Sequence, residues 1–116
     1  MRRRFKFVLA IMILFLMSGM CEAFIRDGSI NGKPGLSFSG LQYSFRTLNV
    51  TIRNRTKYNV NFGATMIFLD KNYKVIAKAE LLNAKIKRRS SRKYKAFFSY
   101  GSGNEAKTAR YLEWEF

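Results

Sequence analysis

The sequence has no histidine and a single cysteine, and both shortages narrow the chemistry open to the chain. Histidine is the commonest general acid–base side chain and a frequent metal ligand. The one cysteine, Cys21, has no partner with which to form an intramolecular disulfide. Catalysis by carboxylates alone would require two acids to be brought together. We therefore expect a protein that is not an enzyme and that holds no metal and no cofactor.

Acidic residues are also scarce, at 7 against 22 lysines and arginines, which leaves a formal net charge of +15. A surplus of this size predicts attraction to polyanions and an association rate that falls as salt is added. Only one proline occurs, Pro34, and no repeat or low-complexity tract is present. Eleven Phe, six Tyr and one Trp supply the large side chains that a small domain needs for its core. These features predict one globular domain.

The first 23 residues follow the order of segments found in a secretory signal. Four basic residues among the first six precede an unbroken apolar run from Phe7 to Met17, and small and polar residues follow. The run is shorter than the roughly 20 residues that a membrane span needs. We expect cleavage after Ala23, because Ala23 and Cys21 are small residues at the −1 and −3 positions of that cleavage site. Residues 24–116 would then be one extracytoplasmic domain (secreted, periplasmic or attached to the cell envelope) without a transmembrane span.

Two alternatives to this cleavage stay open. The apolar run could serve as an uncleaved N-terminal anchor. The letters "SGMC" also resemble a bacterial lipobox, in which Cys21 would become a lipid-modified N-terminus. Ser18 and Met20 depart from the aliphatic and small residues that are usual at those two lipobox positions.

From residue 36 onward, apolar residues alternate with polar ones, as in strands that bury one face. The clearest segments are "LNVTIRN" (48–54), "YNVNFGATMIFLD" (58–70), "KVIAKAEL" (74–81), "YKAFFSY" (94–100) and "RYLEWEF" (110–116). Six or seven short strands of this kind predict an all-β fold, an antiparallel β-sandwich. The competing interpretation is a helix over "KAELLNAKIK" (78–87), supported by the spacing of Ala79, Leu82 and Ile86. A parity slip at Ser39-Gly40 predicts a bulge, and "GSGN" (101–104) reads as a flexible loop.

The segment "MIFLDKNYKVI" (66–76) resembles the FxLYD domain family of bacterial extracytoplasmic proteins. Phe68, Leu69 and Asp70 fall on the later positions of that motif, and Met66 stands where Phe is usual. The resemblance covers about Leu48 to Phe116. It implies an immunoglobulin-like sandwich with a binding or accessory role and no catalytic residues. The family's turn commonly has Gly where this chain has Tyr73, so we expect Asn72 to supply any left-handed residue.

The stretch "KIKRRSSRKYK" (85–95) is the densest run of positive charge. A hairpin between residues 94–100 and 110–116 would place Lys95 opposite Glu113 and Lys93 opposite Glu115, and so neutralise two of its seven cations. The others form a candidate anion-binding loop, because Arg presents a planar fork that matches phosphate. The candidate anion-binding residues are Lys85, Lys87, Arg88, Arg89 and Arg92. The alternative, a solvated charged face without a ligand, stays open.

The predicted export narrows the classes of molecule that the basic residues could bind. It disfavours nucleic acid, the usual partner of a basic patch with aromatics, because intracellular DNA and RNA are out of reach. Phospholipid head groups, lipopolysaccharide phosphates and wall polymers are anions of the cell envelope and remain open. Another extracytoplasmic protein could instead pair with a sheet edge, for which Leu36–Phe45 is the candidate. Asp70 and Asn72 fit a turn better than a calcium loop, because no further acid follows at a suitable spacing.

Overall fold

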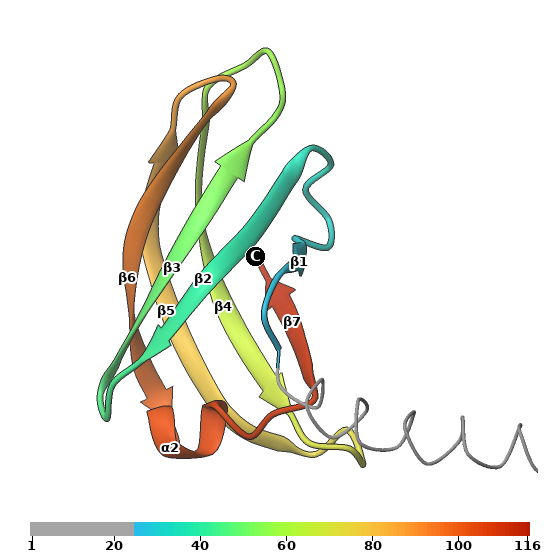
Figure 1. Ribbon diagram of the computed structural model, residues 1–116, viewed down its shortest axis with the longest axis vertical. Helices are drawn as coiled ribbons and strands as arrows, with labels where there is room; N and C mark the ends of the chain where they lie inside the picture. Colours follow the sequence, from blue (N-terminus) through green and yellow to red (C-terminus); the bar gives the residue numbers. More distant parts are fainter. Residues whose placement is uncertain (1–24) are drawn as a thin grey trace, which may run out of the picture.

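The computed structural model describes residues 25–116, which contain seven strands and one short helix. All paired strands are antiparallel, so the predicted all-β class is confirmed (Figure 1). The strands are β1 (Gly28–Ser29), β2 (Leu36–Tyr43), β3 (Thr47–Asn54), β4 (Val60–Leu69), β5 (Val75–Ile86), β6 (Ser90–Tyr100) and β7 (Tyr111–Glu115), and the helix is α2 (Gly103–Ala106).

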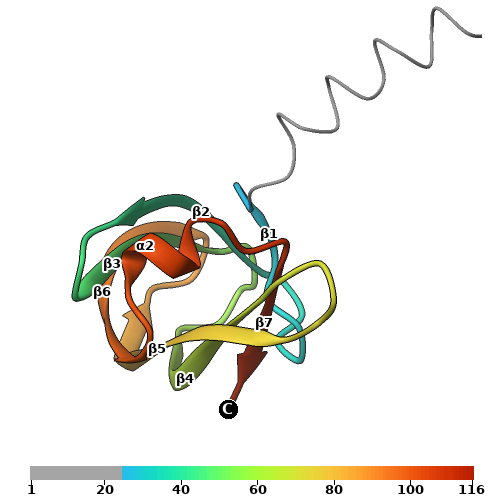
Figure 2. The same ribbon diagram turned by 90° about the horizontal axis from the view of Figure 1, so that it is seen from below.

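The seven strands form one sheet in the order β1-β2-β3-β6-β5-β4-β7, and the sheet curls around its own core (Figure 2). The curl brings its two edges together. The Asn31 side chain, just after β1, donates from Nδ2 to the carbonyl of Trp114 in β7 (3.0 Å). Its Oδ1 accepts from the backbone N–H of Trp114 (2.9 Å). The Phe38 ring packs beside the Trp114 ring, with centroids 5.6 Å apart. The Asn31 side chain therefore makes the pair of hydrogen bonds to β7 that the backbone of a neighbouring strand would make.

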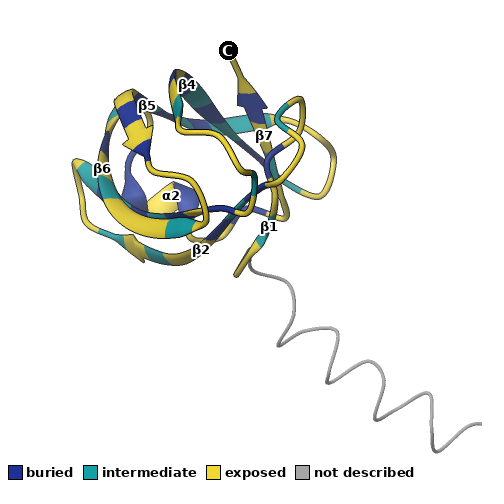
Figure 3. Cartoon of the chain, turned by 90° about the horizontal axis from the view of Figure 1, so that it is seen from above, coloured by how far each residue is buried: buried dark blue, intermediate teal, exposed yellow. Residues whose placement is uncertain are grey.

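The predicted alternation places most of the core correctly, although the strand predicted from Tyr58 begins at Val60 and Tyr58 is exposed. Leu48, Val50 and Ile52 of β3 are fully buried, and their neighbours in sequence are more exposed. In β4, Met66 and Phe68 are fully buried, and Phe62 and Ala64 are buried with 8% of their surface exposed. Buried residues line the inside of the curl and exposed residues the outside (Figure 3). Burying a large apolar side chain contributes about 1.5–3 kcal/mol, so this inner face drives the sheet to close.

The helical alternative for residues 78–87 is wrong, because β5 is a strand paired with β4 along most of its length. Ala79 and Leu81 face inward, but the alternation then slips by one residue. Leu82 and Asn83 both lie opposite Gly63, and Asn83 adopts a left-handed conformation (φ 49°). The bulge leaves Leu82 exposed and turns Ala84 inward. This slip gives a strand the apolar spacing that imitates a helix.

The predicted bulge in β2 is present, with a register shift between Ser39 and Gln42 and a left-handed Gly40 (φ 63°). The β4–β5 turn differs from its prediction, because Tyr73 and not Asn72 is left-handed (φ 63°). The Asp70 carboxylate accepts from the backbone N–H groups of Asn72 (2.8 Å) and Lys74 (2.9 Å), which fixes the backbone on both sides of Tyr73.

Residues 101–104 were predicted to form a flexible loop, and this prediction is wrong. They contain the N-cap and the first two residues of α2. The Ser102 side chain accepts from the backbone N–H of Asn104 (3.2 Å), and the Glu105 carboxylate accepts from the backbone N–H of Ser102 (2.7 Å). This is a capping box, which satisfies free donors at a helix start. A Cβ on Gly103 would lie 2.0 Å from the Ser44 carbonyl oxygen, so only glycine fits there. The helix lies at the end of the curled sheet opposite the β3–β4 and β5–β6 turns (Figures 1 and 2).

Candidate anion-binding site

The last strand does not pair with β6, so the predicted neutralisation of two lysines is wrong. Strand β6 lies between β3 and β5, whereas β7 pairs with β4. Lys95 therefore lies opposite Asn49, and Lys93 lies opposite Thr51. The physical reason is the path through α2, after which the backbone N–H of Arg110 donates to the Leu69 carbonyl (2.8 Å) and starts β7 beside β4.

The β5–β6 turn places two of the predicted arginines at its tip. Arg88 and Arg89 are exposed, and Arg89 adopts a left-handed conformation (φ 52°). The turn is closed by the Ser90 hydroxyl, which donates to the Lys87 carbonyl (2.7 Å). Two guanidinium groups consequently project from the end of a hairpin whose backbone is fixed.

A second turn, between β3 and β4, lies against this one and is joined to it by Asn54. The Asn54 side chain is completely buried, and its Nδ2 donates to the carbonyls of Tyr58 (2.7 Å), Ile86 (3.2 Å) and Lys87 (3.3 Å). Its Oδ1 accepts from the backbone N–H of Thr56 (2.9 Å). Two further contacts, from the Arg89 backbone N–H to the Thr56 carbonyl (3.2 Å) and from the Arg88 backbone N–H to Asn59 Oδ1 (2.9 Å), complete the joint.

The joint brings more positive charge together than sequence reasoning found. Arg55 and Lys57 lie in the β3–β4 turn and are exposed, and neither is among the residues predicted to bind an anion. Residues 53–60 hold three basic side chains and residues 85–93 hold six, which is nine of the 22 in the chain, and neither segment contains an acid. Asp27 is the acid that lines a neighbouring groove with Arg53 and Arg55. The three basic residues in 53–60, with no acid among them, are the sequence feature that could have identified the second turn as part of the site.

A cavity of about 360 Å³ lies beside these turns, where β5 and β6 separate. In the described chain the pairing of β5 with β6 covers Lys78, Ala79 and Glu80 and ends there. The lining residues are Asn59, Val60, Asn61, Lys85, Ile86, Lys87 and Arg92. Three of the five predicted anion-binding residues thus share one cavity, and the other two lie at the adjacent tip.

Tyr94 holds Arg92 at this cavity. The guanidinium carbon of Arg92 lies 5.7 Å from the centre of the Tyr94 ring, and the Tyr94 hydroxyl donates to the Lys85 carbonyl across the separation between the strands. Burial raises the pKa of the Tyr94 hydroxyl, which keeps it protonated as a donor. A cation over an aromatic face is favourable by about 0.5–1 kcal/mol at an exposed site.

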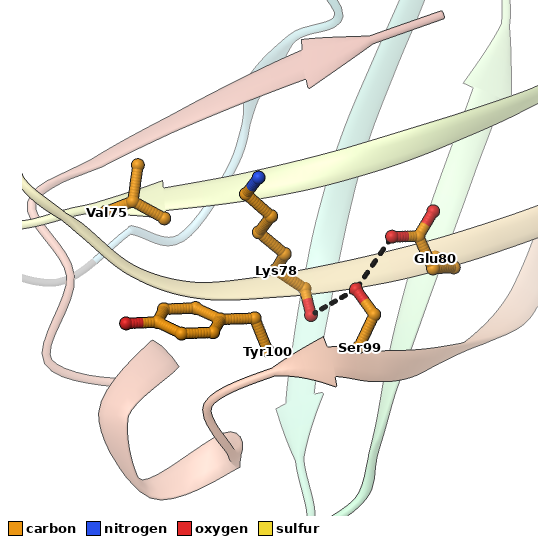
Figure 4. Close-up of a pocket in the computed structure, with 5 residues that line it drawn as sticks. All are labelled: Val75, Lys78, Glu80, Ser99 and Tyr100. Atoms are coloured by element: carbon orange, nitrogen blue, oxygen red, sulfur yellow. Dashed lines mark hydrogen bonds between the residues drawn. The ribbon is translucent and has the colours of Figure 1, made fainter.

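A second cavity, of about 480 Å³, lies near the other end of β5 and is lined by Val75, Lys78, Glu80, Ser99 and Tyr100 (Figure 4). Both oxygens of the Glu80 carboxylate are already bonded, one by the Thr65 hydroxyl (2.7 Å) and one by the Ser99 hydroxyl (2.7 Å). These two hydrogen bonds hold the pKa of Glu80 below its usual value. The two hydrogen bonds therefore stabilise the charged form of this carboxylate and join β5 to β4 and β6.

The remaining candidates from the sequence are separate from the basic end. The Asp70 carboxylate is engaged by the turn amides described above, and in residues 25–116 no three His, Cys, Asp or Glu side chains group together as metal ligands would. Glu113 and Glu115 are exposed on β7. No helix among the described residues is long and apolar enough to cross a membrane. Cys21 and the predicted signal, residues 1–23, lie outside the described residues.

No family model matches the chain, and no curated protein and no solved structure is similar to it.

Proposed function

We propose that the protein is an exported, non-catalytic binding module whose basic end contacts an anionic component of the cell envelope. The observation that carries the proposal is the joint at Asn54, which brings together residues 53–60 and 85–93, two segments that hold nine basic residues and no acid. The anion-binding set is Lys85, Lys87, Arg88, Arg89 and Arg92, together with Arg55 and Lys57 from the second turn.

Charge alone is sufficient for contact with such a surface. Each Lys or Arg near an anionic membrane contributes about 1 kcal/mol, and the contribution falls off within a Debye length. The basic side chains at the two tips are exposed, so they can approach a flat surface or a polymer without rearrangement of the backbone. The binding expected from this arrangement is strongly salt-dependent.

A matched pair of triple variants tests the proposal. Binding to vesicles of phosphatidylcholine and phosphatidylglycerol, and to wall polymer, is titrated across a salt series. At low salt we expect Arg88→Ser/Arg89→Ser/Arg92→Ser to bind about 100-fold more weakly than wild type, because three cations are lost at the contact. The control Arg46→Ser/Lys71→Ser/Lys74→Ser removes the same charge outside the two turns and should bind within about threefold of wild type, since those cations lie away from the contact. Equal losses in the two variants would reject the basic end as the contact.

Export is the second part of the proposal. It is supported by the order of basic, apolar and small segments in residues 1–23. The intact mass of the protein from its native host distinguishes cleavage after Ala23, lipid modification of Cys21 and an uncleaved chain. Recovery of an uncut chain from inside the cell would contradict extracytoplasmic localisation.

The immunoglobulin-like architecture implied by the FxLYD resemblance is also a proposal. It is supported by contacts across the core between opposite walls of the curled sheet. Tyr43 of β2 packs on Phe68 of β4 (6.2 Å between ring centroids), and Phe68 also packs on Phe98 of β6 (6.2 Å). Walls that face each other across a shared core are the packing expected of a sandwich.

An accessory protein–protein role is the alternative, in which the basic residues only solubilise the chain. It is favoured by the edge of β2, because among residues 25–116 the strand β1 pairs only with Ser37 and Phe38 and no strand covers the rest of that edge. Exposed apolar residues of other segments, such as Phe45, Leu82 and Phe97, offer further contact surface. Capture of another extracytoplasmic protein that resists high salt but fails with Leu41→Pro would favour this role.

A further inference from the structure

We propose that the cavity between β5 and β6 is a specific site for a phosphate monoester, with Arg92 as its main ligand. The inference rests on the proposed function and assigns a separate role to each part of the basic end. Arg88 and Arg89 at the tip supply long-range attraction, whereas Lys85, Lys87 and Arg92 bind one phosphate group.

The polar side chains that line the cavity offer donors. Lys and Arg have no acceptor atoms, and the lining contains no acid. Asn59 uses its Oδ1 to accept from the backbone N–H of Arg88 (2.9 Å), which leaves the donor half of its amide for a ligand. A group that fits three cations and amide donors is one that carries two negative charges and only acceptor atoms. A phosphate monoester is such a group at neutral pH, because its second pKa is about 6.

The cavity is also preorganised around Arg92. The Tyr94 ring supports the guanidinium, and the Tyr94 hydroxyl is fixed by the Lys85 carbonyl. That hydrogen bond takes the place of a ladder bond in the region where β5 and β6 are no longer paired. An Arg held in one orientation can present both of its parallel N–H groups to two phosphate oxygens, which a Lys cannot do.

The apolar part of the lining indicates that the phosphate is attached to carbon. Val60 and Ile86, which pair across β4 and β5, form this part of the wall. A volume of about 360 Å³ is within the range of small-molecule sites and exceeds the needs of a bare phosphate ion. The phosphate could come from a soluble polyol phosphate or from a lipid with a terminal phosphate, and the chemistry at the cavity is the same.

The test uses the full chain and three probes: glycerol 3-phosphate, vesicles containing phosphatidic acid, and vesicles containing phosphatidylglycerol at equal surface charge. Arg92→Lys keeps the charge but loses the fork, and we expect it to weaken binding to the monoester probe about tenfold. The control Arg46→Lys makes the same chemical change at an exposed arginine outside the two turns and should leave binding within about twofold. Tyr94→Phe removes only the hydroxyl that holds the site and should weaken binding about threefold to tenfold.

Each outcome decides the proposal. Saturable binding of glycerol 3-phosphate assigns a soluble ester, and preference for phosphatidic acid vesicles alone assigns a lipid; both support a monoester site. Equal effects of Arg92→Lys and Arg46→Lys, with no effect of Tyr94→Phe, would overturn it. Binding to both vesicles without preference, together with no saturable binding of glycerol 3-phosphate, would also overturn it while leaving the proposed envelope contact intact. If the wild-type protein binds neither vesicle at low salt, the envelope contact itself is rejected.

Discussion

At the scale of single residues, Asn54 shows how much of this molecule depends on one buried amide. Its donors reach carbonyls on both sides of the joint between the two turns, and its oxygen accepts from the backbone N–H of Thr56 in the β3–β4 turn. Buried carbonyls left without a donor each cost about 1–3 kcal/mol.

We predict that Asn54→Ala lowers the free energy of unfolding by about 3 kcal/mol, because several of these carbonyls would be left without a donor. Urea unfolding measures the loss. The matched control is Asn59→Ala, an exposed amide in the same turn with one backbone contact, for which we expect less than about 1 kcal/mol. Equal losses in the two variants would contradict a special role for Asn54.

Tyr73 combines an unfavourable backbone conformation with a favourable ring contact. A bulky residue in the left-handed region costs about 1 kcal/mol or more, while its ring stacks on Tyr111 at 4.5 Å with planes 10° apart. Aromatic pairs of this kind contribute about 0.5–1.5 kcal/mol. The two effects are therefore of similar size and opposite sign.

A double-mutant cycle separates them. Tyr73→Gly should change the stability of the wild type by less than about 0.5 kcal/mol, because relief of strain offsets the lost stacking. In a Tyr111→Ala background, the same substitution should stabilise the protein by about 1 kcal/mol. A Tyr73→Gly effect that does not depend on residue 111 would show that the rings are not coupled.

At the scale of elements, the sequence predicted where strands lie better than which strands pair. Alternation in residues 48–54 and 58–70 is a local property, and it identified β3, β4 and their buried faces. The placement of β7 beside β4 depends on the path through α2, whose capping box was not recognised in "GSGN". The anion site was predicted only in part for the same reason. Its five predicted residues are close together in the sequence and could be found from it, whereas Arg55 and Lys57 join them only through contact between two turns.

The seam between the sheet edges gives the element-scale prediction. Asn31→Ala removes both hydrogen bonds to Trp114, so we expect β7 to open more readily and its amide protons to exchange about tenfold faster. Hydrogen exchange followed residue by residue measures this. The control Asn49→Ala, in the middle of the sheet, should leave exchange in β7 unchanged. Unaltered exchange at Trp114 in Asn31→Ala would show that the seam does not hold the strand.

At the scale of the whole molecule, three of the seven acidic residues have structural uses. Asp70 fixes the β4–β5 turn, Glu80 joins three strands, and Glu105 caps α2. Hydrogen bonds to each carboxylate hold its pKa below the usual value: backbone N–H bonds for Asp70, side-chain hydroxyls for Glu80 and Glu105. Such groups stabilise the fold above their unfolded pKa, and this contribution is lost as the pH falls through the lower, folded pKa.

We therefore predict that Glu80→Gln is less stable than wild type at pH 7 and that the difference disappears as the pH is lowered below the ordinary glutamate pKa of 4.5. Thermal unfolding across a pH series measures the convergence. Glu115→Gln, which removes one carboxylate from the exposed face of β7, is the control for the change in net charge. A Glu80→Gln difference that persists unchanged in acid would contradict the hydrogen-bonded role of this carboxylate.

The bonds made by Asn54 go mainly to backbone carbonyls and a backbone N–H. They fix the path of the chain through both turns without fixing which side chains the tips display. Mutational drift at positions 57, 88 and 89 can therefore alter charge and reach while the loop shape is inherited unchanged. Descendants of this sequence could acquire new binding preferences by altering the tips alone, as long as this asparagine is retained.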